Sequence, residues 1–557
     1  MDDRRDTDDV AREGEVTDGV MAAVGAAGHL GEDTGRGEGS YGEEAAESED
    51  AARPGHSRPG TAHSGTAHPD STRSDSTMAP GGATSSASGK AARGGAEWHA
   101  PGEAARGGAE WHAPGDPARG EGKRHVQGDA AEPAPGHREE MPLTGGDGGT
   151  RAAAIALVLL GLVIVAVAAF STPWQVLTSG PPDPARDFSA AQIARAQAFD
   201  AATTLPSYLS LALTIIIAGI LVATPFSARA LGRLRGPWWL RVVLGTLVIT
   251  ALVELIRWPL GIWVETILRD YGLSTQDWAG WAGDRLKNLG VEVFLVCVML
   301  LALVALARKV RRWWIPAAVG AFALTVVTSF VYPVVFEPLF NDFSSMRQGP
   351  LRTNLLDMAA RDGVPVEDVL VADASRRTTA LNAYVSGFGA TRRIVVYDTL
   401  LRAPQREVEL VVAHELGHAK YDDVLYGTVI GALSAGFGAI ALFLVLKPLR
   451  RRTGVTSISD PRAVGVVMGL MTIGSLIMGP AQNVISRHIE ARADVHALDL
   501  TGDPATFIAM QKRLAITNIS DLSPDAVEYV LYASHPSGPE RIAMARAWAK
   551  LNGVPEP

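Results

Sequence analysis

The sequence contains a single cysteine, Cys297, and this residue lies inside an apolar run. Disulfide scaffolds and zinc sites built from several cysteines are therefore excluded. Lysine is also scarce, with eight lysines among the 51 basic residues, and the formal net charge of −9 comes mainly from an acidic N-terminal segment. We interpret the abundant arginine, alanine and glycine as a base-composition bias, and we expect no nucleic-acid partner.

Residues 1–150 have almost no branched aliphatic side chains, and no apolar stretch near Met1 resembles the core of a signal peptide. The sequence from Ala92 to Gly102 recurs from Ala105 to Gly115. A chain this polar and repetitive cannot bury enough apolar surface to offset the entropy lost on ordering. We predict that residues 1–150 form a disordered, low-complexity tail.

Seven later stretches are apolar and long enough to cross a bilayer, which requires roughly 20 residues. They cover approximately residues 152–171, 207–226, 238–256, 289–307, 313–336, 424–446 and 463–485. Seven such runs, each closed by charge or proline, argue against the buried helices of a soluble protein. We predict a multi-pass protein of the cell membrane.

The acids Glu254 and Glu292 lie within these spans, where acidic side chains usually face a bundle interior or a watery cavity.

The connections between spans carry a marked bias in basic residues. Basic clusters follow the second, fourth and sixth spans: Arg229, Arg233 and Arg235; Arg308, Lys309, Arg311 and Arg312; Lys447, Arg450, Arg451, Arg452 and Arg462. The positive-inside rule places these three loops in the cytoplasm. The long segment 337–423 and the C-terminus would then face outward.

Residues 406–420 have a helical pattern that contains the sequence His414-Glu415-Leu416-Gly417-His418. Two histidines four residues apart share one helix face, so both imidazoles can reach one metal ion. Glu415 lies at the flank, where it can deprotonate a water molecule. Because catalytic zinc requires three protein ligands and one open position, we expect a third ligand from another helix.

The segment after the seventh span offers that ligand. Glu490 and Asp494 are one helical turn apart, which suits Glu490 as the third zinc ligand and Asp494 as the acceptor for a ligand imidazole N–H. His488 and His496 remain alternative ligands. The competing interpretation of this segment is an amphipathic helix with solvated charges.

These motifs together resemble the integral-membrane zinc metalloproteases of the type-1 CAAX prenyl protease family, whose smaller relatives include HtpX-type quality-control proteases. The resemblance covers roughly residues 151–550. It includes the His-Glu-x-x-His sequence, Ser486-Arg487 with Glu490 and Asp494, and His535-Pro536 followed by Glu540-Arg541. It implies that His414, His418 and Glu490 bind one Zn²⁺ per chain and that Glu415 is the general base and acid. It also implies a cytosolic site, which conflicts with the sidedness read from the basic loops.

The resemblance further implies roles around the metal. Proteases of this type add an extended substrate to an edge strand, here expected within residues 379–385, which pair with residues 393–397. Asn382 is then a candidate substrate-binding residue, and the competing interpretation is an asparagine at a strand bend. His535 would stabilise the oxyanion. Arg541 is a second candidate for substrate binding, or it pairs with a buried acid. At Asp423 the family commonly has histidine, whereas HtpX-like members tend to have aspartate.

We therefore predict seven transmembrane helices and a mixed α/β, gluzincin-like zinc-metalloprotease domain. Five helices fall within residues 151–336 and two within 424–485. The protease parts are residues 337–423, with the edge strand and the His-Glu-x-x-His helix, and residues 486–557, with the third ligand. The expected partners are a peptide or protein substrate, including membrane-associated ones, and the lipid bilayer. The alternatives are a quality-control protease of misfolded membrane proteins and a seven-helix transporter or receptor without enzymatic activity.

Overall fold

The computed structural model describes residues 147–557 except Thr178 and Phe388. The predicted disordered tail, residues 1–150, lies almost entirely outside these residues and stays a prediction. The first described helix begins at Asp147.

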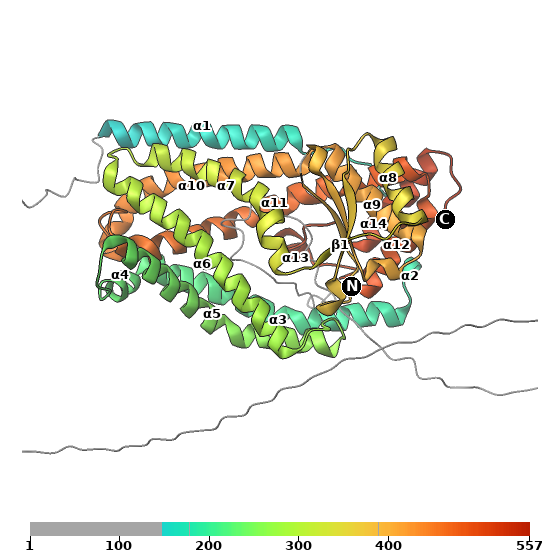
Figure 1. Ribbon diagram of the computed structural model, residues 1–557, viewed down its shortest axis with the longest axis horizontal. Coiled ribbons are helices and arrows are strands. Elements are labelled where there is room, and N and C mark those ends of the chain that lie inside the picture. Colours follow the sequence, from blue (N-terminus) through green and yellow to red (C-terminus); the bar gives the residue numbers. More distant parts are fainter. Residues whose placement is uncertain (1–146, 178, 388) are drawn as a thin grey trace, which may run out of the picture. The chain divides into compact units, whose positions relative to one another are not determined.

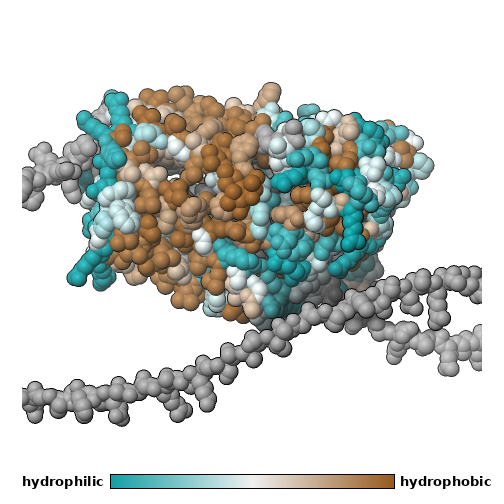
Figure 2. All heavy atoms as spheres, in the orientation of Figure 1, coloured by the Kyte–Doolittle hydropathy of each residue, from teal (hydrophilic) through white to brown (hydrophobic). Residues whose placement is uncertain are grey.

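Seven helices in the described part of the chain are long and apolar enough to cross a membrane, which confirms the predicted number. At most 33% of the most apolar window of each helix is buried within the protein, so the remaining apolar surface requires lipid. Figure 2 shows this surface as a broad hydrophobic band. The helices are α1 (Asp147–Ser171), α3 (Ala190–Ala223), α5 (Trp238–Asp270), α6 (Trp278–Lys309), α7 (Trp314–Val331), α10 (Asp423–Thr453) and α11 (Val464–Thr501).

The membrane helices pack in two neighbouring groups (Figure 1). Helices α1 and α7 both lie along α10, whereas α3 packs on α11 and on α5, which in turn packs on α6. Fully buried apolar residues such as Val242 of α5, Leu300 of α6 and Val466 of α11 form one core of this bundle.

Several helices extend well beyond the spans expected from hydropathy. Helix α3 begins at Ala190, where Ser189 and Gln192 form a capping box, and α6 begins at Trp278 because Asp277 caps it. Side-chain caps satisfy the free backbone N–H groups of a helix start whether or not the residues that follow are apolar. The helix limits therefore follow the caps, while the predicted limits followed hydropathy alone.

Helix α11 joins the seventh span directly to the segment that carries Glu490 and Asp494. Beyond residue 485 its apolar side chains turn into the protease core, where Ala497 and Leu498 are fully buried. The same helix therefore crosses the membrane region and positions the candidate third ligand.

The protease part contains a four-stranded sheet with the order β1-β2-β4-β3. The central pair β2 and β4 is parallel, and both outer pairs are antiparallel. Strand β3 is therefore an edge strand. The strands are β1 (Phe343–Ser345), β2 (Asp368–Ala372), β3 (Ala383–Ser386) and β4 (Arg393–Tyr397).

The strand expected to start at residue 379 starts later, at Ala383. The backbone just before it is bonded elsewhere, because the N–H of Leu381 donates to the side chain of Asn518 and the carbonyl of Ala380 accepts from the hydroxyl of Thr399. Side-chain partners from other elements thus replace the strand ladder at this point.

Helices from the middle and from the C-terminal part of the described chain share one core with this sheet. Leu355, Leu416, Phe507 and Ile542 are completely buried there, each from a different helix. These helices are α8 (Pro350–Asp362), α9 (Gln405–Lys420), α12 (Pro504–Thr517) and α14 (Gly538–Leu551), with α13 (Ala526–Leu531) beside α11. The short elements are α2 (Pro184–Asp187), α4 (Phe226–Leu231), η2 (Tyr332–Phe336), η3 (Glu337–Leu339), η4 (Ala374–Arg376), η5 (Gly389–Thr391), η6 (Leu400–Arg402) and η7 (Pro461–Ala463).

The two acids predicted within the spans lie inside the bundle. Glu254 accepts hydrogen bonds from Arg285, at 3.0 Å from Nε and 2.6 Å from Nη2. Glu254, Arg257 and Glu292 line a hollow of about 50 Å³ together with residues of α3 and α11. Pairing with an arginine is a common way to keep a carboxylate such as that of Glu254 at membrane depth.

Candidate active site

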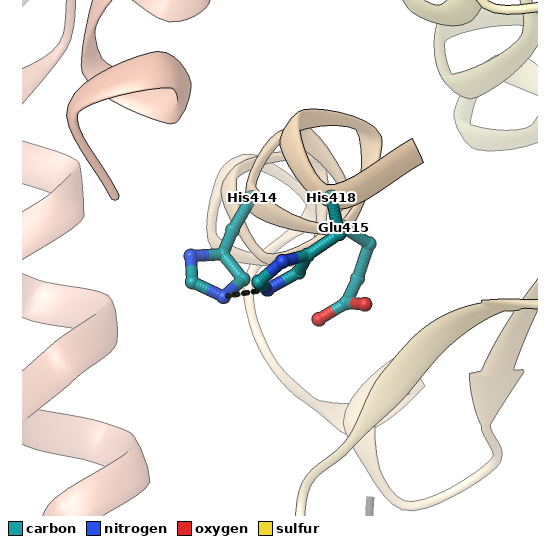
Figure 3. A group of neighbouring side chains, drawn as sticks. All are labelled: His414, Glu415 and His418. Carbon is teal, nitrogen blue, oxygen red and sulfur yellow. Dashed lines mark hydrogen bonds between the residues drawn. The ribbon is translucent and has the colours of Figure 1, made fainter. Parts of the chain in front are cut away.

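Helix α9 carries His414, Glu415 and His418 at the centre of the protease part (Figure 3). The Nε2 atoms of the two histidines lie 3.1 Å apart, as expected for residues four positions apart on a helix. The carboxylate of Glu415 lies to the side of His418, and one donor atom of each of the three residues falls within 4.8 Å of the others. Helix α9 cannot shift easily, because Val412 and Leu416 on its other faces are completely buried.

Helix α11 brings a second carboxylate to the two imidazoles. Glu490 Oε2 lies 3.1 Å from His414 Nε2, and its Oε1 lies 3.5 Å from His418 Nε2. Glu415 is also near, but among the described residues it forms no ion pair with either histidine. Of the two acids, Glu490 is therefore the one in direct contact with both ring nitrogens.

Gly417 allows α9 and α11 to approach this closely. A Cβ at this position would lie 3.2 Å from the Cα of Ala493 and 3.1 Å from the ring of His496. Contacts this short would require the neighbouring atoms of α11 to move by a few tenths of an ångström. The glycine between the two histidines therefore contributes to the distance at which Glu490 meets them.

The other ring nitrogen of each histidine contacts an aspartate. Asp494 Oδ1 lies 2.8 Å from His414 Nδ1, and Asp423 Oδ2 lies 3.0 Å from His418 Nδ1. A carboxylate at Nδ1 fixes the ring orientation and leaves Nε2 free to bind a metal. In the sequence, Asp423 stands out only as a departure from the family pattern. Its position five residues after His418, at the start of α10, is the signal that points to this contact.

Arginines in turn hold these two aspartates. Arg541 Nε donates to Asp494 Oδ2 at 2.8 Å, and Arg541 Nη2 lies 3.3 Å from His414 Nδ1. Arg492 pairs with Asp423 in the same way. The guanidinium of Arg541 thus pairs with a buried acid, which is one of the two roles expected for this residue. Its contact with substrate stays a prediction.

The carboxylates make this site strongly attractive to positive charge. Burial alone would lower the pKa of His414, but hydrogen bonds with Asp494 and Glu490 outweigh it and raise this pKa. Burial likewise opposes the charge of His418, yet Glu490 and Asp423 hold its pKa well above the usual value. For Glu415, burial raises the pKa despite the two nearby histidines. In the folded chain, protons and metal cations therefore compete for the imidazole nitrogens.

The donor set fits one small divalent metal ion. Two imidazoles and a carboxylate are the usual ligands of catalytic metals that keep an open position. Donors about 2.1 Å from a tetrahedral ion lie roughly 3.4 Å from one another. The observed separations of 3.1, 3.1 and 3.5 Å are close to that value.

The alternative ligands His488 and His496 are engaged elsewhere. The ring of His488 packs edge-on against Trp174, with centroids 5.2 Å apart. His496 Nε2 lies 2.9 Å from Asp362. In the part of the chain that the structure describes, neither His488 nor His496 forms a hydrogen bond with His414 or His418.

His535 lies at the edge of the donor set. Its Nε2 is 3.4 Å from Glu490 Oε2, and its side chain remains 53% exposed. Arg487 of α11 anchors this loop by donating to the backbone carbonyls of Tyr529 and Ala533, and Glu540 forms a capping box with Ser537 just after it. Arg487 and Glu540 both belong to the family motifs in the sequence. The sequence gives no sign that they position the His535 loop.

Asn382 directly precedes the edge strand β3. Its Oδ1 accepts the N–H of Ala383 at 2.8 Å, and its backbone carbonyl accepts the N–H of Tyr397. This local contact is typical of an asparagine at a strand bend. Its role in substrate binding stays a prediction.

Two family models match this chain. Peptidase family M48 matches residues 345–549, and the CAAX prenyl protease N-terminal family, described as five membrane helices, matches residues 175–342. The first match contains α9, the Glu490 segment of α11 and His535.

Individual relatives agree with these models. An uncharacterised metalloprotease of Bacillus subtilis, YhfN, is 30% identical over 322 residues, which are 56% of this chain and 73% of that protein. The CAAX prenyl protease 1 homologue of Oryza sativa is 34% identical over 228 residues, or 40% of this chain and 53% of its own length. CAAX prenyl protease 1 of Saccharomyces cerevisiae is 26% identical over 320 residues, or 53% of this chain and 69% of the yeast protein. None of these relatives is named as a transporter or receptor.

The crystal structure of S. mikatae Ste24p has a similar fold, with a TM-score of 0.58 at 20% identity. The similarity covers 71% of this chain and 98% of that one. It confirms the predicted fold class, seven membrane helices with a mixed α/β protease domain. This chain therefore belongs to peptidase family M48 and is a membrane-embedded metallopeptidase that acts on peptides or proteins.

Proposed function

We propose that this chain is a zinc endopeptidase in which His414, His418 and Glu490 bind one zinc ion and Glu415 transfers the proton. The observation that carries this proposal is the contact of Glu490 on α11 with both Nε2 atoms on α9, at 3.1 and 3.5 Å. Asp494 and Asp423 would support it from the opposite side of each ring by accepting the Nδ1 protons.

Zinc is the metal that this donor chemistry favours. Two imidazoles and one carboxylate with a fourth position open form the donor set of well-known zinc peptidases. Hard cations such as Mg²⁺ and Ca²⁺ prefer sites made of oxygen ligands alone. When bound, zinc supplies Lewis-acid polarisation of the scissile carbonyl.

Glu415 is the group that would move protons. It accepts a proton from the attacking water and later delivers it to the leaving amine. Burial raises the pKa of Glu415, which makes its carboxylate a better proton acceptor than an exposed glutamate. His535, whose Nε2 faces the donor set and whose side chain is half exposed, would donate to the developing oxyanion.

The edge strand β3 would bind the substrate backbone. An extended peptide can add to such an edge through main-chain hydrogen bonds, and β3 pairs with β4 on its other side. Asn382, directly before this strand, would contact the peptide backbone. Arg541 would act mainly through Asp494 and the His414 ring.

The substrate class that we propose is a membrane-associated peptide or protein. Curated relatives named CAAX prenyl protease 1 favour a lipidated C-terminal peptide as the first candidate. Asp423, which resembles HtpX-like members at this position, favours misfolded membrane proteins as the second. Cleavage of one peptide with and without its lipid group distinguishes the two, because only the first candidate requires the lipid.

The decisive test compares Glu415→Gln with Glu367→Gln in the purified full-length protein. Glu367 is exposed and outside the site, so it is a matched control for the same chemical change. We expect Glu415→Gln to lower casein hydrolysis about 10²–10⁴-fold while zinc remains near one per chain, and Glu367→Gln to change neither. Loss of zinc in Glu415→Gln would contradict the assignment of Glu415 as proton carrier rather than ligand.

A further inference from the structure

Four arginines line one hollow formed by α4, η7 and the end of α10. In Figure 1, α4 lies at the end of the membrane helices that is far from the sheet. Arg229 comes from α4, Arg451 and Arg452 from the last turn of α10, and Arg462 from η7 just before α11. The hollow has a volume of about 360 Å³, which is within the range of small-molecule sites. We call it the arginine pocket.

The arginine pocket holds far more positive than negative charge. Arg462 pairs with Asp460 at 2.6 Å. Arg229, Arg451 and Arg452 form no ion pair with a carboxylate among the described residues. Like charges held in one hollow repel one another, so an anion bound there would stabilise the arrangement.

The helix dipole accounts for only part of this cluster. Basic residues in the last turn of a helix interact favourably with its carbonyl end, and this explains Arg451 and Arg452 on α10. Arg229 and Arg462 lie at the ends of two other, short helices, and the dipole of α10 does not explain why these ends face the same hollow.

The position of the arginine pocket indicates which anion would bind. Figure 2 shows hydrophilic side chains along the end of the hydrophobic band where these helices terminate. On α4, Arg229 lies three residues after Phe226, whose side chain is 56% exposed, so the two are neighbours on the helix surface. A ligand at this site would therefore meet guanidinium groups and, next to them, the exposed apolar ring of Phe226.

We infer that the arginine pocket binds the headgroup of an anionic phospholipid. Guanidinium groups bind phosphate oxygens through paired hydrogen bonds, and basic pockets between transmembrane helices are known to hold anionic headgroups. The acyl chains would lie on the apolar surface beside Phe226. A free phosphate ion shares the headgroup chemistry but makes no use of that surface.

The test measures lipid binding to the full-length protein in a neutral detergent by native mass spectrometry, with phosphatidylglycerol, phosphatidylcholine and inorganic phosphate as separate ligands. Each arginine near an anionic lipid strengthens binding about fivefold. We expect Arg229→Gln/Arg451→Gln/Arg452→Gln to weaken phosphatidylglycerol binding on the order of 100-fold. Phosphatidylcholine should bind weakly to both proteins, and casein hydrolysis should persist.

The matched control is Arg235→Gln/Arg311→Gln/Arg312→Gln, which removes the same charge from exposed positions on the same side but outside the arginine pocket. Equal loss of binding in this control would overturn the site in favour of general surface charge. Phosphate that displaces the lipid at equal concentration would overturn the lipid assignment. If the triple variant fails to fold, the single variant Arg229→Gln decides, because it should still weaken binding about fivefold.

Discussion

Charged side chains are arranged in opposite ways at the two ends of α11. Near Glu490, His414 and His418 each contact an aspartate. Each aspartate in turn accepts from an arginine, Asp494 from Arg541 and Asp423 from Arg492. Near Arg462, at the beginning of the helix, three further arginines face one hollow without a carboxylate partner among the described residues. The two places are separated by roughly 40 Å of helix.

The difference follows from what each place must do. Catalysis requires donor atoms that are fixed to a fraction of an ångström. Carboxylates that hold the histidines, and arginines that hold the carboxylates, fix these atoms within the protein itself. A site for a mobile anion requires charges that remain available. The metal site should therefore be sensitive to the loss of any single partner, whereas the arginine pocket should lose affinity in proportion to the arginines removed.

The largest effect is expected from Glu490→Ala, which removes a proposed ligand. Zinc content should fall well below one per chain, and casein hydrolysis should be lost with it, because two histidines alone bind zinc weakly. His488→Ala, two residues away on the same helix, is the control and should retain its zinc. Full zinc occupancy in Glu490→Ala, measured by elemental analysis, would mean that the third ligand lies elsewhere.

The side of the membrane on which each end of α11 lies gives an all-or-none contrast between the candidate metal site and the arginine pocket. After Cys297 is replaced, a single cysteine is introduced either at Ser344 of β1 or at Thr456 near the arginine pocket, both of which are exposed. The basic loops predict that a membrane-impermeant maleimide labels residue 344 and not residue 456 in intact cells. Labelling of residue 456 alone would contradict the positive-inside prediction and support the cytosolic site implied by the family resemblance.

An intermediate effect is expected from Asp494→Ala and Asp423→Ala. Each removes the acceptor for one histidine N–H, so zinc affinity should fall about 10–100-fold while binding remains measurable. Competition with a chelator of known zinc affinity measures this change. If either variant binds zinc as tightly as the original chain, that aspartate does not orient its histidine.

A smaller effect, on the stability of the fold, is expected at a paired carboxylate that lies away from the proposed metal site. The side chain of Asp187 of α2 is almost fully buried and contacts Arg546 at 2.8 Å and Lys512 at 3.0 Å. Burial alone would raise the pKa of Asp187, but the hydrogen bonds from these two cations lower it overall. Asp187→Asn should therefore lower the free energy of unfolding by roughly 3 kcal/mol at neutral pH and leave zinc content unchanged.

The pH dependence of this difference follows from the direction of the shift. A carboxyl group whose pKa is lowered by folding contributes stability above its ordinary pKa, and this contribution is lost as the pH falls through the folded value. The gap in thermal stability between the original chain and Asp187→Asn should persist at pH 6 and shrink below about pH 4. A gap that grows on acidification would contradict the ion-pair explanation.

Much of this protein could be predicted from local patterns. Seven apolar runs indicated the membrane helices because their length and composition are properties of continuous sequence. The His-Glu-x-x-His spacing placed His414 and His418 on one face for the same reason, since helical periodicity is local. The spacing of Glu490 and Asp494 likewise predicted two acids on one face of a single helix.

Other features depended on packing between distant segments. Hydropathy could not reveal that α11 continues past its apolar part, because Ala497 and Leu498 are recognisable as core residues only once α9 lies against them. The engagement of His488 with Trp174 and of His496 with Asp362 was likewise invisible in a sequence that offered both as ligands.

The sequence by itself determined the chemistry of this protein: a membrane-embedded chain with two histidines and nearby acids in the spacing of a metallopeptidase. Only the tertiary structure decided which acid meets both imidazoles, that Asp423 faces His418, that Arg487 anchors the His535 loop, and that arginines from α4, α10 and η7 share one hollow. The physical reason is that helical periodicity fixes neighbours within one turn. Contacts between residues 69 or more positions apart, such as Asp423 with Arg492 and His414 with Glu490, arise only when whole helices pack.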